Sequence, residues 1–269
     1  MRYREWGEPD NPRVLVCVHG LARTGADFNR LARALSADYR VVCPDVVGRG
    51  ESGWLPAPGV YGLPQYVSDM VSLIARLDVK EVDWLGTSMG GLIGIAIAGQ
   101  AQAPVRRLVI NDVGPRLEAE AISRIGDYVG RAPHFADLAA ARAYVRAISA
   151  PFALSDEEQW NEVVDSVLRV EGEGWRLHYD PRIGDAFRAT TPQIAAAGEA
   201  ALWQLYDSIR APTLLVRGEQ SDLLTCATAA EMRVRGPRPQ VVEVAGVGHA
   251  PLFMDEAQIA FVRNFLLGE

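Results

Sequence analysis

The stretch WLGTSMGGLIG, residues 84–94, decides the fold of this chain. It places Ser88 between Gly86 and Gly90 in the pattern G-x-S-x-G. The apolar run that ends at Gly86 predicts a buried strand, and the apolar run that starts at Met89 predicts a helix. A sharp strand-to-helix turn forces its serine into a strained backbone, and the two glycines remove side chains that would collide across it. Because the helix N-terminus also points free N–H groups here, Ser88 is a candidate nucleophile.

Apolar runs without polar alternation flank this stretch on both sides. They predict strands at residues 13–20, 39–45, 81–86, 105–113, 211–218 and 239–246. Helical spacing lies between them, as in residues 64–79, so we expect an α/β fold with a mostly parallel sheet that helices cover on both faces. Residues 115–206 show no strong strand and read as helices. The predicted organisation is a core of residues 1–114 and 207–269 with a helical cap of residues 115–206, inserted after the fourth clear core strand.

Composition limits the classes of function. The 269 residues carry a net charge of −7, which argues against a nucleic-acid or anionic-membrane surface. The N-terminus lacks the apolar stretch of a signal peptide, and no window is long and apolar enough for a membrane span. Three cysteines without a CxxC pair fit a reducing compartment, so we expect a cytoplasmic protein. No metal-ligand motif or phosphate-binding loop is visible, so no metal and no cofactor are expected. The expected partner is a small molecule; monomer and homodimer both stay open.

A serine nucleophile needs a base, and the chain has four histidines. His249 follows the last predicted strand in a glycine-flexed loop, so we predict that it is the general base. An orienting carboxylate must then stabilise the imidazolium. Asp222, in VRGEQSDLLT, follows a core strand and is our predicted acid. Asp112, in INDVGP, also ends a core strand and is the alternative; otherwise it caps the turn that follows.

The loop after the first core strand, VCVHGLARTG, supplies a second group of candidates. The backbone N–H groups of Leu21 and Met89 are the predicted oxyanion hole. His19 is expected to shape this loop near the substrate. Arg23 could bind a substrate carboxylate bidentately, although pairing with the cap is the simpler expectation. Some cap aromatics are expected to line an apolar pocket, with Trp203 as the candidate substrate contact; the set is Phe152, Trp160, Trp175, Phe187, Trp203 and Tyr206.

Five motifs together resemble the α/β-hydrolase fold superfamily: HG at 19–20, DVVGRGES at 45–52, GTSMGG at 86–91, RGEQSD at 217–222 and GHAP at 248–251. The order serine, aspartate, histidine also matches that superfamily. The resemblance spans nearly the whole chain and is weakest in the insertion. It implies a helical cap over Ser88 and a structural loop at 45–52, in which Arg49 braces the loop. The chain is similar to the compact esterase and carbon–carbon-bond hydrolase group.

Three functions follow as hypotheses. The first is a serine hydrolase, carboxylesterase-like, that cleaves a small carboxylic ester, lactone or thioester through an acyl-enzyme on Ser88. The second is a carbon–carbon-bond hydrolase of a dienoate or diketone acid, which would use the same triad and give Arg23 a substrate to bind. The third is a non-catalytic small-molecule receptor on the same fold. The sequence leaves the substrate itself open.

Overall fold

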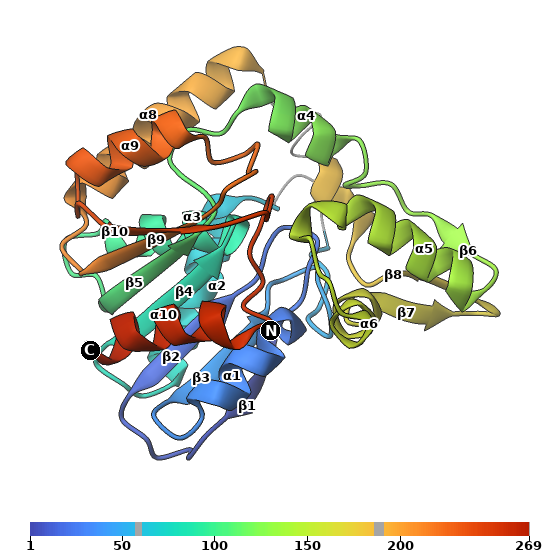
Figure 1. Cartoon of the computed structure of the whole chain (residues 1–269), viewed down its shortest axis with the longest axis horizontal. Helices are drawn as coiled ribbons and strands as arrows, with labels where there is room; N and C mark the ends of the chain where they lie inside the picture. The colour runs from blue at the N-terminus through green and yellow to red at the C-terminus, as the bar shows by residue number, and fades with distance from the viewer. Residues whose placement is uncertain (57–60, 186–190, 269) are drawn as a thin grey trace.

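A seven-stranded sheet forms the centre of the computed structural model, which describes residues 1–56, 61–185 and 191–268 (Figure 1). The strands lie in the order β1-β3-β2-β4-β5-β9-β10. Their bounds are β1 Arg2–Trp6, β2 Val14–Val18, β3 Arg40–Asp45, β4 Val82–Thr87, β5 Val105–Asn111, β9 Thr213–Gly218 and β10 Gln240–Val244. Only β1 pairs antiparallel, with β3; the other neighbours in this sheet are parallel. The predicted core strands are confirmed, and β1 is an edge strand whose mostly exposed side chains gave no apolar signal.

Helices cover both faces of the sheet, because the apolar side chains of the inner strands point to both sides. One face packs against α2 (Leu63–Arg76), α3 (Met89–Ala98), α8 (Pro192–Ser208) and α9 (Cys226–Val234). The other packs against α1 (Asn29–Leu35) and α10 (Glu256–Leu267), and its core includes the buried free thiols of Cys17 and Cys43. The fold class predicted from the sequence is therefore confirmed. No helix among the described residues is long and apolar enough to cross a bilayer.

Most of the segment between β5 and β9 extends above and to the right of the central sheet in Figure 1, whereas α8 lies at the upper left beside α9. Its helices are α4 (Ala119–Gly126), α5 (Leu138–Ile148) and α6 (Glu157–Asp165), before α8 returns to the core. It also holds a small antiparallel sheet of β6 (His134–Phe135), β8 (Gly174–Leu177) and β7 (Leu168–Glu171). The expectation of helices alone was wrong here, because strands of two to four residues are too short to show an apolar pattern.

The last helix of this segment belongs by its packing to the sheet. A Cβ added to Gly99, at the end of α3, would lie 2.4 Å from the carbonyl oxygen of Leu205 in α8. Trp203 and Tyr206 of α8 are buried in the main core cluster. The close approach of α3 and α8 places the second half of α8 in the helix layer that covers the sheet. This part of residues 115–206, the range expected to form the cap, therefore packs with the core.

Backbone hydrogen bonds fasten this layer to the core beside the loop of residues 45–52. The N–H of Gly50 donates to the carbonyl of His178 at 2.9 Å, and the N–H of Asp180 donates to the carbonyl of Gly48 at 2.8 Å. Gly48 has a φ of +84°, and a Cβ there would lie 2.7 Å from the ring of Tyr61, so glycine is required for this approach. The 45–52 loop therefore fixes where the cap stands relative to the sheet.

Candidate active site

Ser88 occupies the turn between β4 and α3, as the sequence predicts. Its φ is 52° and its ψ is −114°, a region that non-glycine residues rarely adopt. A Cβ on Gly90 would lie 2.0 Å from the carbonyl oxygen of Val18 in β2, and one on Gly86 would lie 2.1 Å from the carbonyl oxygen of Gly90. Both glycines are therefore needed for the helix to approach the sheet and hold the serine in its strained conformation.

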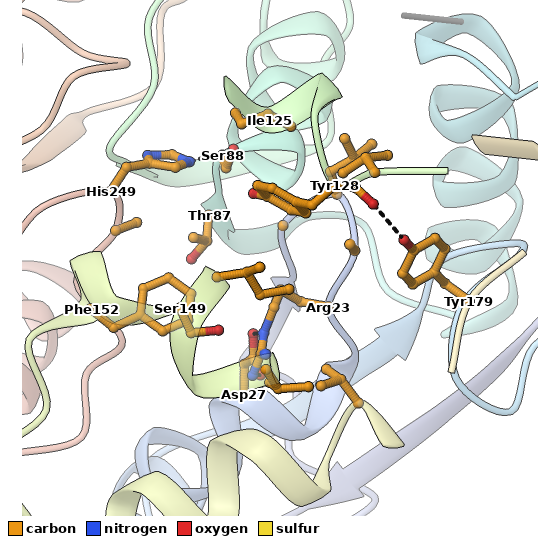
Figure 2. A pocket seen from close by; sticks show the side chains of 18 of the residues that line it. Arg23, Asp27, Thr87, Ser88, Ile125, Tyr128, Ser149, Phe152, Tyr179 and His249 are labelled. Atoms are coloured by element: carbon orange, nitrogen blue, oxygen red, sulfur yellow. Dashed lines mark hydrogen bonds and ion pairs between the residues drawn. The ribbon is translucent and has the colours of Figure 1, made fainter. Parts of the chain in front are cut away.

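His249 reaches Ser88 from the loop after β10. Its Nε2 lies 3.0 Å from the Oγ of Ser88, and Figure 2 shows the imidazole directed at the serine. With its proton on Nδ1, the imidazole leaves Nε2 free to accept the serine proton. The structure thus brings together the two residues that the sequence paired as nucleophile and base.

The carboxylate that meets His249 is Asp112 and not Asp222. Nδ1 of His249 lies 2.8 Å from Oδ2 of Asp112, and the N–H of Gly218 donates to Oδ1 of the same side chain at 2.9 Å. Asp112 follows β5, the strand next to β4 in the sheet, and its side chain is fully buried. The prediction of Asp222 as the orienting acid is therefore corrected, and the alternative that the sequence left open takes its place.

Asp222 faces the cap. Arg124 of α4 donates to both of its carboxylate oxygens, at 2.7 and 2.8 Å, and the Asp222 side chain is 47% exposed. Its burial alone would raise the pKa of Asp222, but the guanidinium of Arg124 outweighs that effect and lowers it. Asp222 stands four residues beyond the end of β9, and its carboxylate pairs with the cap.

The predicted oxyanion donors border the serine. A Cβ on Gly20 would lie 3.7 Å from the Cβ of Ser88, so the loop that continues into Leu21 passes directly beside the nucleophile. Met89 is the first residue of α3, where backbone N–H groups point out of the helix. A carbonyl oxygen placed between this loop and the start of α3 would face the positive end of the α3 dipole.

Arg49, which was expected only to brace its own loop, reaches the predicted oxyanion loop. It is fully buried, and its Nε donates to the carbonyl of Leu21 at 2.8 Å, while Nη2 lies 3.5 Å from the sulfur of Met89. Nη1 donates to the hydroxyl of Tyr66 at 3.0 Å. The Arg49 side chain therefore contacts both residues of the predicted oxyanion hole. In the sequence, the glycines on either side of Arg49 marked a loop but did not indicate these contacts.

Asn111 was also missed. Its side-chain nitrogen donates to the Oγ1 of Thr87 at 2.9 Å and to the carbonyl of Pro251 at 2.7 Å. These bonds tie the end of β4 to the loop that carries His249. The residue stands beside Asp112 at the end of a buried strand, where a polar side chain is unusual, and that position was the available signal.

Two of the predicted substrate contacts lie outside the cavity. His19 is fully buried; its Nδ1 lies 2.7 Å from the carbonyl of Gly20, and its Nε2 accepts from the N–H of Val46 at 3.0 Å. Burial lowers its pKa to about 4, so it is neutral and shapes the loop. Trp203 packs edge-on against Tyr206 in α8. Both predictions of substrate contact are therefore corrected.

Arg23 lines the cavity, but its guanidinium is already occupied. It binds both carboxylate oxygens of Asp27, at 2.9 and 2.6 Å, and Nη2 donates to the carbonyl of Val163 in the cap at 2.9 Å. A substrate carboxylate would have to displace these partners. The simpler expectation of an arginine that pairs with the cap describes what the structure shows.

The cavity over Ser88 lies between the core and the cap and is small, about 80 Å³. Its walls are mainly apolar: α4, α5 and the segments after them contribute Ile125, Val129, Val145, Ile148 and Phe152, and the loop after β10 contributes Leu252. Phe152 is the member of the predicted aromatic set that lines it; Phe187 lies outside the described residues. The part of the chain that the structure describes contains no cluster of three or more histidine, cysteine or carboxylate side chains with metal-binding geometry.

Comparison with known proteins gives a consistent result. A family profile described as the alpha/beta hydrolase family matches residues 15–263. A 3-hydroxybutyrate-oligomer hydrolase of Cupriavidus necator is 54% identical over 272 residues, which cover 100% of this chain and 93% of that protein. A 2-(acetamidomethylene)succinate hydrolase of Mesorhizobium japonicum is 27% identical, over 88% of this chain and 81% of that protein.

A solved alpha/beta hydrolase structure from Novosphingobium aromaticivorans superposes with a TM-score of 0.85 at 31% identity, and covers 99% of this chain and 98% of that one. The chain belongs to the alpha/beta hydrolase family.

Proposed function

We propose that this protein is a serine hydrolase that cleaves small carboxylic esters through an acyl-enzyme on Ser88. The observation that carries the proposal is the continuous chain of hydrogen bonds from Ser88 through His249 to the buried Asp112, at the floor of a mostly apolar cavity. A receptor would have no need of a strained serine aligned with a base and its carboxylate.

The reaction follows from these positions. Nε2 of His249 takes the proton of Ser88 as Oγ attacks the ester carbonyl carbon, and Asp112 stabilises the imidazolium that forms. When the tetrahedral intermediate collapses, His249 gives that proton to the departing alkoxide, which leaves as the alcohol. A water molecule then loses a proton to His249 and attacks the acyl carbon. The acid is released, and the proton returns to Ser88.

The negative charge of each intermediate falls on the former carbonyl oxygen. We assign its stabilisation to the N–H groups of Leu21 and Met89, assisted by the N-terminus of α3. Arg49 is a positioning residue here, since it holds the carbonyl of Leu21 and contacts Met89. Its buried positive charge also lies on the side of the site where the oxyanion forms.

The Cupriavidus necator relative suggests the natural substrate. At 54% identity over the whole chain, its printed activity supports short 3-hydroxybutyrate oligomers as the ester that this protein cleaves. A small apolar cavity suits a four-carbon acyl unit. We also propose a cytoplasmic location, since all three cysteines are free and two are buried thiols.

The test compares wild type, Ser88→Ala and Ser208→Ala on p-nitrophenyl butyrate and on the 3-hydroxybutyrate dimer, together with labelling by a serine-reactive fluorophosphonate. Ser208 is exposed on α8 and serves as the matched control. We expect turnover and labelling in wild type and Ser208→Ala, and loss of both in Ser88→Ala. Full activity in Ser88→Ala would exclude this nucleophile, and absence of turnover and label in wild type would favour the receptor hypothesis.

The carbon–carbon-bond hydrolase hypothesis loses its main support. It relied on Arg23 to bind the substrate's carboxylate, and Arg23 is engaged by Asp27 and by the cap. Turnover of a dienoate ring-fission product that falls in Arg23→Ala would reinstate it.

A further inference from the structure

Tyr128, two residues after the end of α4, is a cap residue with a polar group in the cavity over the nucleophile. It lines the cavity, and Figure 2 shows its ring entering the cavity with the hydroxyl directed toward Ser88. The hydroxyl of Tyr179 donates to the backbone carbonyl of Tyr128 at 3.4 Å, a bond that is drawn in the same view. This hydrogen bond holds the backbone of the cap segment that carries the Tyr128 ring.

The phenol is set to donate a hydrogen bond. Burial raises the pKa of Tyr128, so its hydroxyl keeps its proton at neutral pH. The guanidinium of Arg124, which also lines the cavity, lowers the pKa of the phenol but does not outweigh burial, and Asp222 holds that guanidinium through two hydrogen bonds. The protonated phenol can therefore donate its own proton to an acceptor in the cavity.

The position of Tyr128 limits what that acceptor can be. The substrate's carbonyl oxygen belongs between Leu21 and the start of α3, on the core side of Ser88, whereas Tyr128 stands on the cap side. The wall around the phenol includes the apolar side chains of Ile125 and Val129 as well as Arg124, which Asp222 holds. The phenol can therefore reach the acyl chain beyond the carbonyl, and Ser149 is a second polar group of the cap in the same wall.

We propose that Tyr128 is a specificity residue that donates its hydrogen bond to an oxygen on the acyl chain, so that the site selects esters of short 3-oxygenated acids over plain alkanoyl esters. The inference rests on the proposed ester hydrolysis at Ser88. A 3-hydroxybutyryl group carries such an oxygen two carbons from the carbonyl, as a hydroxyl in a terminal unit and as an ester oxygen inside an oligomer. Both accept a hydrogen bond.

A plain butyryl chain would offer no acceptor to the phenol proton of the partly buried Tyr128. A polar group desolvated in this way discriminates between ligands by about 10-fold to 100-fold. The quantity to measure is the quotient of kcat/KM for p-nitrophenyl 3-hydroxybutyrate over kcat/KM for p-nitrophenyl butyrate. The leaving group is the same in both, so the quotient reports the acyl oxygen alone.

The experiment measures this quotient in wild type, Tyr128→Phe, Tyr144→Phe and Ser149→Ala. Tyr144 is a matched control, because it lies on α5 outside the cavity over Ser88. Ser149 is the rival, since its hydroxyl also lines the cavity. We expect a wild-type quotient of about 10 or more, a fall of about tenfold in Tyr128→Phe through KM, and wild-type quotients in the other two variants.

Several outcomes would overturn the inference. The first is a wild-type quotient near one, an outcome that does not depend on whether any variant folds. The others are an unchanged quotient in Tyr128→Phe, an equal loss of kcat/KM on both esters in that variant, and a fall of the quotient confined to Ser149→Ala. If wild type cleaves butyrate through Ser88 without preference, the inference fails and the hydrolase function stands. If wild type cleaves neither ester and takes no phosphonate label, both fail.

Discussion

Replacing Asp112 by asparagine removes one charge, and the structure predicts which way the new amide will turn. The N–H of Gly218 donates to Oδ1 of Asp112, so the amide oxygen of the asparagine must take that position. The amide NH₂ then faces Nδ1 of His249, where Oδ2 stood before. Because an NH₂ group donates, Nδ1 must accept, and the imidazole proton moves to Nε2. Nε2 then points an N–H at Ser88 and can no longer take its proton.

This wrong tautomer removes general-base catalysis and the charge that stabilises the imidazolium. In a serine protease the equivalent change lowers kcat by about 10⁴, and we expect a loss of about 10³ to 10⁴ in Asp112→Asn. Asp222→Asn breaks only the half-exposed pair with Arg124, and its loss of kcat should be at most about threefold.

The assay is steady-state kinetics of both variants on p-nitrophenyl butyrate, with phosphonate labelling of Ser88 as a direct measure of nucleophilicity. Thermal unfolding of each variant serves as the control, since asparagine fills nearly the same volume as aspartate and both variants should fold. A loss of kcat in Asp222→Asn that equals or exceeds that in Asp112→Asn would refute the assignment and restore the acid first expected from the sequence.

Three further predictions concern the supports of the site. Gly90→Ala should destabilise the fold by about 2 kcal/mol or more in urea unfolding, because its Cβ would lie 2.0 Å from a carbonyl oxygen of β2, whereas Gly198→Ala in open space on α8 should not destabilise it. Arg49→Met should lower kcat about tenfold or more with little change in KM, and partial recovery in Arg49→Lys would separate its charge from packing; a loss in KM alone would contradict its oxyanion role. The pKa of His19 is about 4 in the folded protein, compared with an ordinary value of 6.5. Between these two pH values the imidazole binds a proton in the unfolded chain but not in the folded one, so the free energy of unfolding falls as the pH is lowered from about 6.5 to 4. Between pH 7.5 and 5 wild type should therefore lose about 2 kcal/mol more than His19→Gln, and equal losses would show that His19 does not titrate in this way.

The nucleophile and its base were predictable from the sequence because their signals are local. The glycines around Ser88 indicate a turn that has no room for side chains. The apolar runs on either side indicate that the strand and the helix that meet there are buried. The position of His249 after the last strand follows from a parallel sheet, in which loops at the carboxyl ends of the strands gather at one edge. Local patterns thus determined the fold class, Ser88 and His249.

The acid was decided by tertiary structure. Asp112 and Asp222 both follow core strands, and nothing in the sequence tells which strand lies beside β4 or how far a loop carries its side chain. The sheet order places β5 next to β4, and Gly218 of β9 fixes the Asp112 carboxylate in a buried position. Asp222, four residues beyond β9, meets Arg124 of the cap.

The cap shows the same division between local and non-local information. Its strands are too short to give an apolar period, and the placement of Tyr128, Arg124 and Phe152 over Ser88 depends on how the cap packs on the 45–52 loop. The sequence by itself determined the sheet, the strained serine and its histidine, because each is encoded by residues adjacent in the chain. The identity of the acid and the lining of the pocket depend on contacts between distant segments, which only the tertiary structure brings together.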